Sequence, residues 1–245
     1  ELSAEQTLER LVEAVYHASN NTIKYQAFDS APRRIGADGG APGANIRSAF
    51  LVREGAGIEG IELKSSFSTD DPCSDSAGGA FHRSRKPLYL RFTYKNESYL
   101  VVNLHLKSKF GDVAELSHST TEPTQTDRSR ALQIGALAKD LQATVAAAHA
   151  PHIIVLGDFN DDVSSPSFTP LHRSLGLVQM RDRRGQAFDW SHVHNGVSTA
   201  IDQLWVSPSM VSAGYQAQYV HLNTYAVDPA SDHDPVVLSK AWSNR

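Results

Sequence analysis

The chain has 245 residues, 40% of them hydrophobic, and a formal net charge of −4 at pH 7. This composition can fill a substantial core, and no stretch approaches the run of about 18 apolar residues that a membrane-spanning helix needs. With Cys73 as its single cysteine, the chain excludes an intrachain disulfide, a zinc finger and a redox-active cysteine pair. The acidic balance does not exclude a nucleic-acid partner, because phosphate recognition needs only a local basic patch.

The first predicted element is a helix over residues 4–18, where Leu and Val recur at helical spacing after a capping box that begins at Ser3. Residues 29–45 are rich in Gly, Ala and Pro and predict a loop. Residues 46–53 and 58–63 have strand-like composition, and we expect the two segments to pair with each other.

The next segment, residues 65–80, is dominated by Ser, Asp and Gly and predicts a long surface loop. In residues 88–94, the side chains of Leu88, Leu90, Phe92 and Tyr94 alternate with those of Tyr89, Arg91 and Thr93. This period of two is typical of a strand. A turn at residues 95–97 leads into a returning strand over residues 99–106. That strand is nearly continuous in apolar character until its end, where His105 lies.

The second half begins with a polar loop over residues 107–127 and a second helix. The residues expected to form the buried stripe of this helix are Leu132, Leu137, Leu141 and Val145. Further strands are expected at residues 153–156, 187–193, 200–207, 215–222 and 235–241. Strands interleaved with two helices and several hairpins indicate an α/β fold with a mixed sheet.

Ionisable side chains gather at four strand ends. His105 lies between apolar neighbours, where a lone histidine is more often a core residue. Asp158 and Asn160 can project to one side of an extended segment, although both are also common in turns. Asp202 lies inside an apolar strand, where a carboxylate requires a partner. Residues 231–235 (Ser-Asp-His-Asp-Pro) would, taken alone, predict a solvated turn.

Together these residues fit phosphoryl chemistry, which needs an activated water, charge neutralisation and proton transfer. Asp158 can accept a proton from the attacking water while Asn160 holds that water in place. Asp232 can supply a carboxylate oxygen to Mg²⁺. Asp202 can bond the far nitrogen of His233 and raise its basicity.

Four segments resemble those of a known superfamily: residues 103–108 (Asn-Leu-His-Leu-Lys-Ser), 157–161 (Gly-Asp-Phe-Asn-Asp), 201–207 (Ile-Asp-Gln-Leu-Trp-Val-Ser) and 231–236 (Ser-Asp-His-Asp-Pro-Val). In this order the sequence is similar to the endonuclease/exonuclease/phosphatase superfamily, which includes pancreatic-type DNases, abasic-site repair endonucleases, neutral sphingomyelinases and inositol polyphosphate 5-phosphatases. The resemblance implies a four-layer α/β sandwich with two packed mixed β-sheets flanked by helices. It also implies a divalent metal and hydrolysis of a phosphate ester.

The resemblance implies catalytic roles for five residues. His105 is similar to the first active-site histidine of the family, and His233 to the second, with Asp202 as its orienting carboxylate. Asp158 and Asn160 are similar to the pair that activates water and contacts the phosphate. Hydrolysis by this set would be assisted by both the metal and the His and Asp side chains.

The resemblance also implies metal and phosphate ligands. Asp232 is similar to a ligand of Mg²⁺, for which Mn²⁺ or Ca²⁺ are alternatives. Arg85 resembles the arginine with which DNases touch a backbone phosphate, and Arg47 is a weaker candidate, for which a solvated face is the favoured interpretation. The family has two strands ahead of its first helix, so we expect a single domain over residues 1–245 that lacks these strands. Glu1 stands where the metal-binding glutamate would end the second of them.

We therefore expect a Mg²⁺-dependent phosphodiesterase of the endonuclease type that acts on nucleic acid, DNA in particular. One alternative is a phosphatase or phospholipase C-type phosphodiesterase that acts on inositol phosphates or sphingomyelin. It ranks lower because no membrane-inserting aromatic hairpin or dense lysine pocket is evident. A second alternative is a non-catalytic nucleic-acid-binding remnant, motivated by the missing strands.

We expect a monomer that does not bind membranes. The Ser/Asp/Gly-rich loop and the absence of basic character favour a secreted or periplasmic enzyme over a cytoplasmic one. The choice between DNA and RNA, and between endonuclease and exonuclease, is left open by the sequence.

Overall fold

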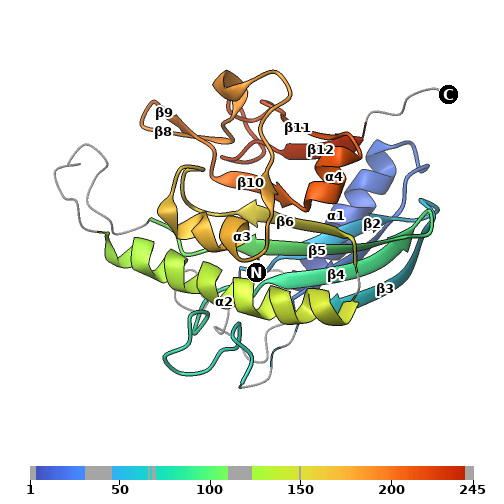
Figure 1. Cartoon of the computed structure of the whole chain (residues 1–245). Coiled ribbons are helices and arrows are strands. Elements are labelled where there is room, and N and C mark those ends of the chain that lie inside the picture. The colour runs from blue at the N-terminus through green and yellow to red at the C-terminus, as the bar shows by residue number, and fades with distance from the viewer. Residues whose placement is uncertain are drawn as a thin grey trace.

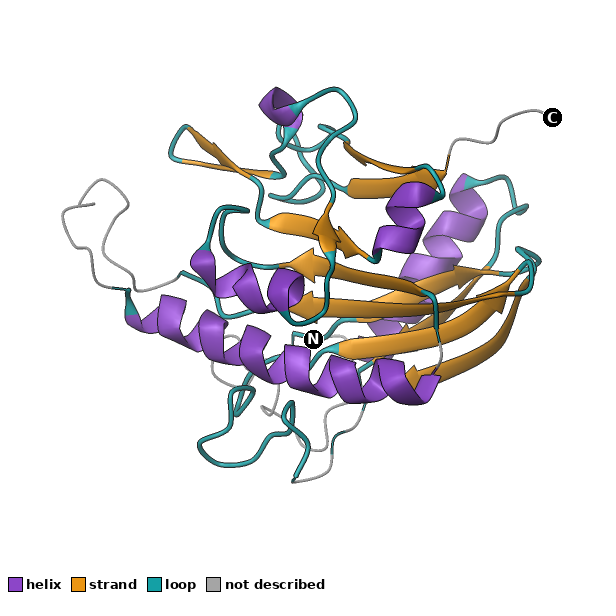
Figure 2. Cartoon of the chain, viewed as in Figure 1, coloured by secondary structure: helices purple, strands orange, loops and turns teal. Residues whose placement is uncertain are grey.

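The structure, a computed structural model, describes residues 4–30, 46–65, 67, 70–109, 123–148 and 150–240. Its elements, shown in Figures 1 and 2, are α1 (Ala4–Ala18), β1 (Tyr25–Asp29), β2 (Ala49–Arg53), β3 (Ile58–Lys64), β4 (Leu88–Tyr94), β5 (Glu97–His105), α2 (Gln125–Ala148), β6 (His152–Asp158), η2 (Pro166–Phe168), α3 (Thr169–Arg173), β7 (Val178–Gln179), η3 (Gln186–Phe188), β8 (His192–His194), β9 (Val197–Thr199), β10 (Asp202–Val206), α4 (Pro208–Ser212), β11 (Tyr215–Tyr219) and β12 (Val236–Lys240). Helices and strands are interleaved along the chain, which confirms the predicted α/β class.

The largest sheet has six strands in the order β3-β4-β5-β6-β10-β7. β5 and β6 are parallel, and α2 forms the crossover between them. β3–β4, β4–β5, β6–β10 and β7–β10 are antiparallel pairs. The sheet is therefore mixed, as predicted, and α2 runs along one of its faces (Figure 1).

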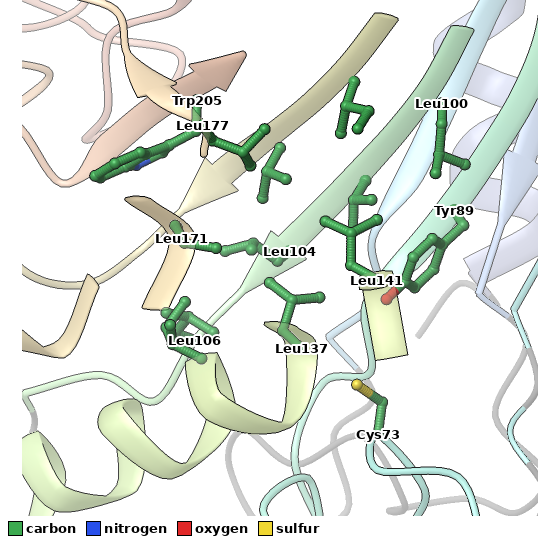
Figure 3. Packing of buried hydrophobic residues seen from close by; sticks show 14 of the residues in the cluster. Cys73, Tyr89, Leu100, Leu104, Leu106, Leu137, Leu141, Leu171, Leu177 and Trp205 are labelled. Carbon is green, nitrogen blue, oxygen red and sulfur yellow. The ribbon is translucent and has the colours of Figure 1, made fainter. Parts of the chain in front are cut away.

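The main hydrophobic core lies between this sheet and α2. Ile134, Leu137 and Leu141 of α2 are fully buried and belong to one cluster with Leu104 of β5 and Val155 of β6. Figure 3 shows the two α2 leucines and Leu104 within this cluster. Full burial of such a side chain contributes roughly 1.5–3 kcal/mol, so this face of α2 holds the helix on the sheet.

The stripe predicted for α2 is only partly correct. Leu137 and Leu141 are buried and Val145 packs at the edge of the cluster, but Leu132 is 64% exposed. Ile134 takes its place, because Leu132 is two residues away and so about 200° around the helix from that position. In the part of the chain that the structure describes, no helix combines the length and the apolarity needed to cross a membrane.

The opposite face of the sheet is covered by two separate strand pairs, β1–β2 and β11–β12. Tyr99 and Leu204 of the main sheet pack with Ala217 of β11. Elsewhere on this face, the side-chain amide of Asn103 donates to the carbonyl oxygen of Ala49 in β2 at 3.1 Å. Within the described residues, the predicted second sheet thus corresponds to two pairs of strands.

Two predictions about strands are wrong. β3 pairs with β4 and not with β2, whose partner is β1. Gly55 and Gly57, both with positive φ, lie in the turn between β2 and β3, and the chain passes there from a strand pair to the edge of the main sheet. The strand predicted at residues 187–193 is instead the short 3₁₀ helix η3 followed by the start of a hairpin, β8–β9.

Gly157 is required by the close approach of β5 and β6. Its φ is +130°, and a Cβ atom at this position would lie 1.9 Å from the carbonyl oxygen of Leu104. Any side chain would therefore push the two strands apart, directly beside the residue that follows, Asp158. Glycine avoids both the clash and the backbone strain.

We expect Gly157→Ala to reduce the free energy of unfolding by about 3 kcal/mol or more, because it combines a steric clash with an unfavourable φ. The matched control is Gly214→Ala. Gly214 has a φ of +82°, but a Cβ there would meet no atom within 4 Å, so only the backbone cost of about 1 kcal/mol applies. Urea unfolding measures both; equal losses in the two variants would contradict the clash.

Candidate active site

Three predicted site residues lie side by side at one end of the main sheet. His105 is the last residue of β5, Asp158 the last of β6 and Asp202 the first of β10. The strand register pairs His105 with Asp158, and Asp158 with Asp202. Paired residues of neighbouring strands project to the same face of a sheet, so the three side chains form a row.

This row lies on the face of the sheet opposite to α2. Leu104, Val155 and Trp205 belong to the core that α2 covers. Side chains alternate between the two faces along a strand, and each residue of the row is one or three positions away from one of these three. The side chains of the row therefore point away from α2. The hairpin β8–β9 lies beyond the start of β10 (Figure 1).

Asp158 and Asn160 form a closed unit at the end of β6. Asn160 has a φ of +52°, and its backbone N–H donates to Asp158 Oδ1 at 2.8 Å while its side-chain amide donates to Oδ2 at 3.0 Å. Phe159 between them is fully buried, with its ring edge-on to Phe168 at 5.2 Å. The prediction that Asp158 and Asn160 project to the same side is confirmed.

Asp161, the next residue, is paired with basic side chains outside the row. It is 8% exposed, and its two carboxylate oxygens lie 3.0 Å from Lys109 Nζ and 3.4 Å from Arg130 Nε. Arg130 is fully buried in α2. Asp161 therefore neutralises a buried cation instead of facing the row.

His105 and Arg85 flank Asp158. His105 Nε2 lies 3.3 Å from Asp158 Oδ2. Arg85 is 8% exposed and donates from Nη2 to the carbonyl oxygen of Leu106 at 2.5 Å, while its buried Nε has no hydrogen-bond partner among the described residues. Burial, together with the charges of Arg85 and His233, lowers the pKa of His105 to about 4, so its ring is neutral at pH 7.

Asp158 has the opposite shift. Burial and the negative charge of Asp202 together raise the pKa of its carboxyl to about 6, against the stabilising effect of the Asn160 N–H and of His233 and Arg85. Asp158 is therefore ionised at pH 7 but retains the basicity of a group that titrates just below neutrality, which suits a general base.

His233 completes the site from the segment before β12. Its Nδ1 lies 2.6 Å from Asp202 Oδ2, so the predicted contact between these two residues is confirmed. The hydrogen bond to Asp202 raises the pKa of His233 to about 9 against the effect of burial. The ring is thus protonated at neutral pH, and Nε2 is the nitrogen left to face a ligand.

Ser191 ties the separate segments of the site together. It is fully buried; its Oγ accepts from the backbone N–H of Asp202 at 3.0 Å, and its carbonyl oxygen accepts from the N–H of Asp234 at 2.6 Å. Asp234, 2% exposed, accepts in turn from the N–H groups of Asn223 and Thr224. Asp234 therefore fixes the conformation of its segment, and its neighbour His233 is held against Asp202.

His192, which follows Ser191, was not predicted to belong to the site. A β-bridge pairs it with His233, and the two ring centroids are 5.0 Å apart. Burial, with the charge of His233, lowers the pKa of His192. The available signal was the pattern His-Val-His before Asn195-Gly196, because Asn-Gly is the strongest short hairpin signal.

The remaining predicted ligands have separate positions. Asp232 is exposed beside His233 and offers one carboxylate, which fits the habit of Mg²⁺ of using one or two carboxylates together with waters and substrate phosphates. Arg47 donates to Asp29 Oδ2 at 2.6 Å next to the β1–β2 pair, so its guanidinium already has a carboxylate partner. Its role in phosphate binding stays a prediction. Glu1 lies outside the described residues.

Residues 14–233 match the Endonuclease/Exonuclease/phosphatase family. The chain belongs to this family. A comparison with curated proteins finds no match.

Three solved structures are similar in fold. A 3′ phosphatase, NExo, from Neisseria bound to a product DNA hairpin superposes with a TM-score of 0.60 at 13% identity, over 98% of this chain and 86% of that one. A family protein from Bacteroides thetaiotaomicron superposes with a TM-score of 0.57 at 17% identity, over 94% of this chain and 79% of that one. Truncated TDP2 from Caenorhabditis elegans superposes with a TM-score of 0.55 at 13% identity, also over 94% of this chain and 79% of that one. At these identities the similarity shows the fold and does not determine the substrate.

The pKa values of His105 and His233 can be measured by NMR titration of the metal-free protein. We expect the His233 ring to keep its proton up to about pH 9 and the His105 ring to stay neutral down to about pH 4. In Asp202→Asn the imidazolium loses its carboxylate partner, so the pKa of His233 should fall toward the ordinary value of about 6.5. A His233 that titrates near 6.5 in the unmodified protein would contradict the assigned pairing.

Proposed function

We propose that the chain is a divalent-metal-dependent phosphodiesterase that hydrolyses nucleic-acid phosphodiester bonds, DNA in particular. The observation that supports this proposal best is the row of side chains at one sheet end, in which Asp158 pairs with Asp202 and Asp202 bonds His233, so that the pKa values of Asp158 and His233 are both raised. The pKa of Asp158 is about 6 and that of His233 about 9, so at neutral pH the first is a base and the second a cation. A base and a protonated donor in one site are the two groups that acid–base catalysis uses.

In the proposed mechanism Asp158 accepts the proton of the attacking water. Asn160 holds the Asp158 carboxylate through two hydrogen bonds, of 2.8 and 3.0 Å, so the base has a fixed orientation before substrate binds. Such pre-organisation removes the reorientation cost from the chemical step. In this proposal Asn160 also contacts the water and the phosphate.

Positive charge for the phosphate comes from the other side of the row. The protonated ring of His233, oriented by Asp202, donates from Nε2 to a phosphate oxygen as negative charge develops there. Arg85 is buried close enough to Asp158 to lower its pKa, so its guanidinium adds positive charge on this side of the site. The neutral ring of His105 adds a further donor or acceptor.

A metal bound at Asp232, Mg²⁺ in the first instance with Mn²⁺ or Ca²⁺ as alternatives, supplies charge neutralisation at the phosphate. The family membership supports a phosphate-ester substrate. Nucleic acid is supported by the similarity to NExo, whose structure contains a product DNA hairpin. Because that protein is described as a 3′ phosphatase, removal of a terminal phosphate from DNA is the alternative reaction on the same site.

We expect Asn160→Ala and His233→Ala each to lower the rate of plasmid nicking in Mg²⁺ by about 10²–10⁴, the usual contribution of a positioned acid, base or oxyanion donor. His194→Ala is the matched control, since His194 is an exposed histidine on β8. Full activity in His233→Ala would show that the assignment is wrong. Parallel assays on linear duplex, single strands, RNA, 3′-phosphorylated oligonucleotide, inositol phosphates and sphingomyelin decide the substrate class.

The pH dependence follows from Asp158. A general base works only when deprotonated, so kcat/KM should fall about tenfold per unit as the pH drops below about 6, the pKa of this carboxyl. The measurement is the nicking rate from pH 4.5 to 8 at fixed ionic strength. A rate that stays constant down to pH 5 would contradict the role of Asp158 as the base.

A further inference from the structure

One group of three potential metal ligands occurs among the residues that the structure describes: His192, Asp232 and His233. One ligand atom of each lies within 4.8 Å of those of the other two. His192 comes from β8, whereas the other two come from the segment before β12, about forty residues later in the chain. The β-bridge between His192 and His233 brings these segments together.

The donor set suits a different class of ion from the one proposed for catalysis. Mg²⁺ prefers an all-oxygen environment and keeps several waters. Two imidazoles and one carboxylate suit Zn²⁺ and neighbouring first-row ions, and catalytic zinc sites commonly have three protein ligands with one position open. His192, Asp232 and His233 match that set.

The ligands are also held in place by the surrounding structure. Asp202 accepts from His233 Nδ1 at 2.6 Å, which directs Nε2 outward; this carboxylate–histidine arrangement is the usual support of a zinc-binding imidazole. Ser191 anchors the backbone beside His192. Bonds of about 2.0–2.1 Å to an ion bring ligand atoms to about 3.4 Å from one another, so the 4.8 Å spacing must shrink. The exposed side chain of Asp232 can make this movement.

We propose that His192, Asp232 and His233 bind a Zn²⁺-class ion and that this ion inhibits the enzyme. The ion displaces the proton of His233 Nε2, which is released to solvent, so that the ring can no longer donate to the substrate phosphate. The ion also competes with Mg²⁺ for Asp232. Binding of the ion is independent of the reaction, whereas its inhibitory effect rests on the proposed function. The two parts therefore need separate readouts.

The binding readout uses ZnCl₂ alone as the probe. Zn²⁺ affinity is measured by competition with a chromogenic chelator in excess Mg²⁺, for the unmodified protein, His192→Asn, Asp232→Asn and the control His194→Asn. Loss of a ligand should weaken Zn²⁺ binding at least tenfold in His192→Asn and in Asp232→Asn. His194 lies two residues from His192 with its ring stacked at 5.9 Å, yet is not one of the three ligands, so its variant should bind like the unmodified protein.

Three binding outcomes would overturn the site: no stoichiometric binding by the unmodified protein, unchanged affinity in both ligand variants, or an equal loss in His194→Asn. Because Asp232 is exposed, its replacement keeps the test valid even if His192→Asn disturbs the hairpin; circular dichroism reports any such disturbance. A chain that binds Zn²⁺ as expected but hydrolyses no phosphate ester would refute the proposed function and leave the metal site intact.

The inhibition readout is plasmid nicking in Mg²⁺ with increasing ZnCl₂. The Zn²⁺ concentration for half inhibition should rise at least tenfold in His192→Asn and stay unchanged in His194→Asn. Inhibition with the same midpoint in His192→Asn and in the unmodified protein would show that the ion acts elsewhere.

Discussion

The site depends on one electrostatic constraint: the register of β6 and β10 places two carboxylates, Asp158 and Asp202, on directly paired residues. Like charges in such a position repel each other, so each needs its own compensation. Asp202 has it in the protonated ring of His233. Asp158 is stabilised by the N–H and side-chain amide of Asn160 and still has its pKa raised to about 6. Burial and this repulsion together make Asp158 a base that titrates near neutrality beside a cation, a combination that suits phosphodiester hydrolysis.

The fold maintains this arrangement through short-range contacts between distant segments. Gly157 lets β5 and β6 approach closely enough for the row to form. Ser191 bonds both to the start of β10 and to the segment that contains His233. The same hydrogen bonds bring His192 next to His233. The contacts that orient the catalytic ring therefore also assemble three possible ligands for a Zn²⁺-class ion. Catalysis and inhibition would then share one imidazole.

The sequence was sufficient where the signal was local. The helix at residues 4–18 and the strand over residues 88–94 were predicted from local patterns, and the structure confirms both. The alternation of Asp158 and Asn160 likewise indicated that their side chains can meet, as they do. Pairings between distant segments were not accessible in this way. β3 pairs with β4 and not with its neighbour along the chain, and His192 reaches His233 through a β-bridge between segments about forty residues apart. Asp202 is intermediate: its burial demanded a partner, and only the motif around His233 identified one.

The most direct test of this electrostatic arrangement is the pKa of the Asp158 carboxyl itself, measured by ¹³C NMR in the metal-free protein. We expect about 6 in the unmodified protein. In Asp202→Asn the neighbouring negative charge is gone, while His233 remains protonated over the acidic range, so the pKa of Asp158 should fall. An Asp158 that titrates near the ordinary value of about 3.9 in the unmodified protein, or that does not respond to Asp202→Asn, would contradict the coupling of the two carboxylates from which the proposed function follows.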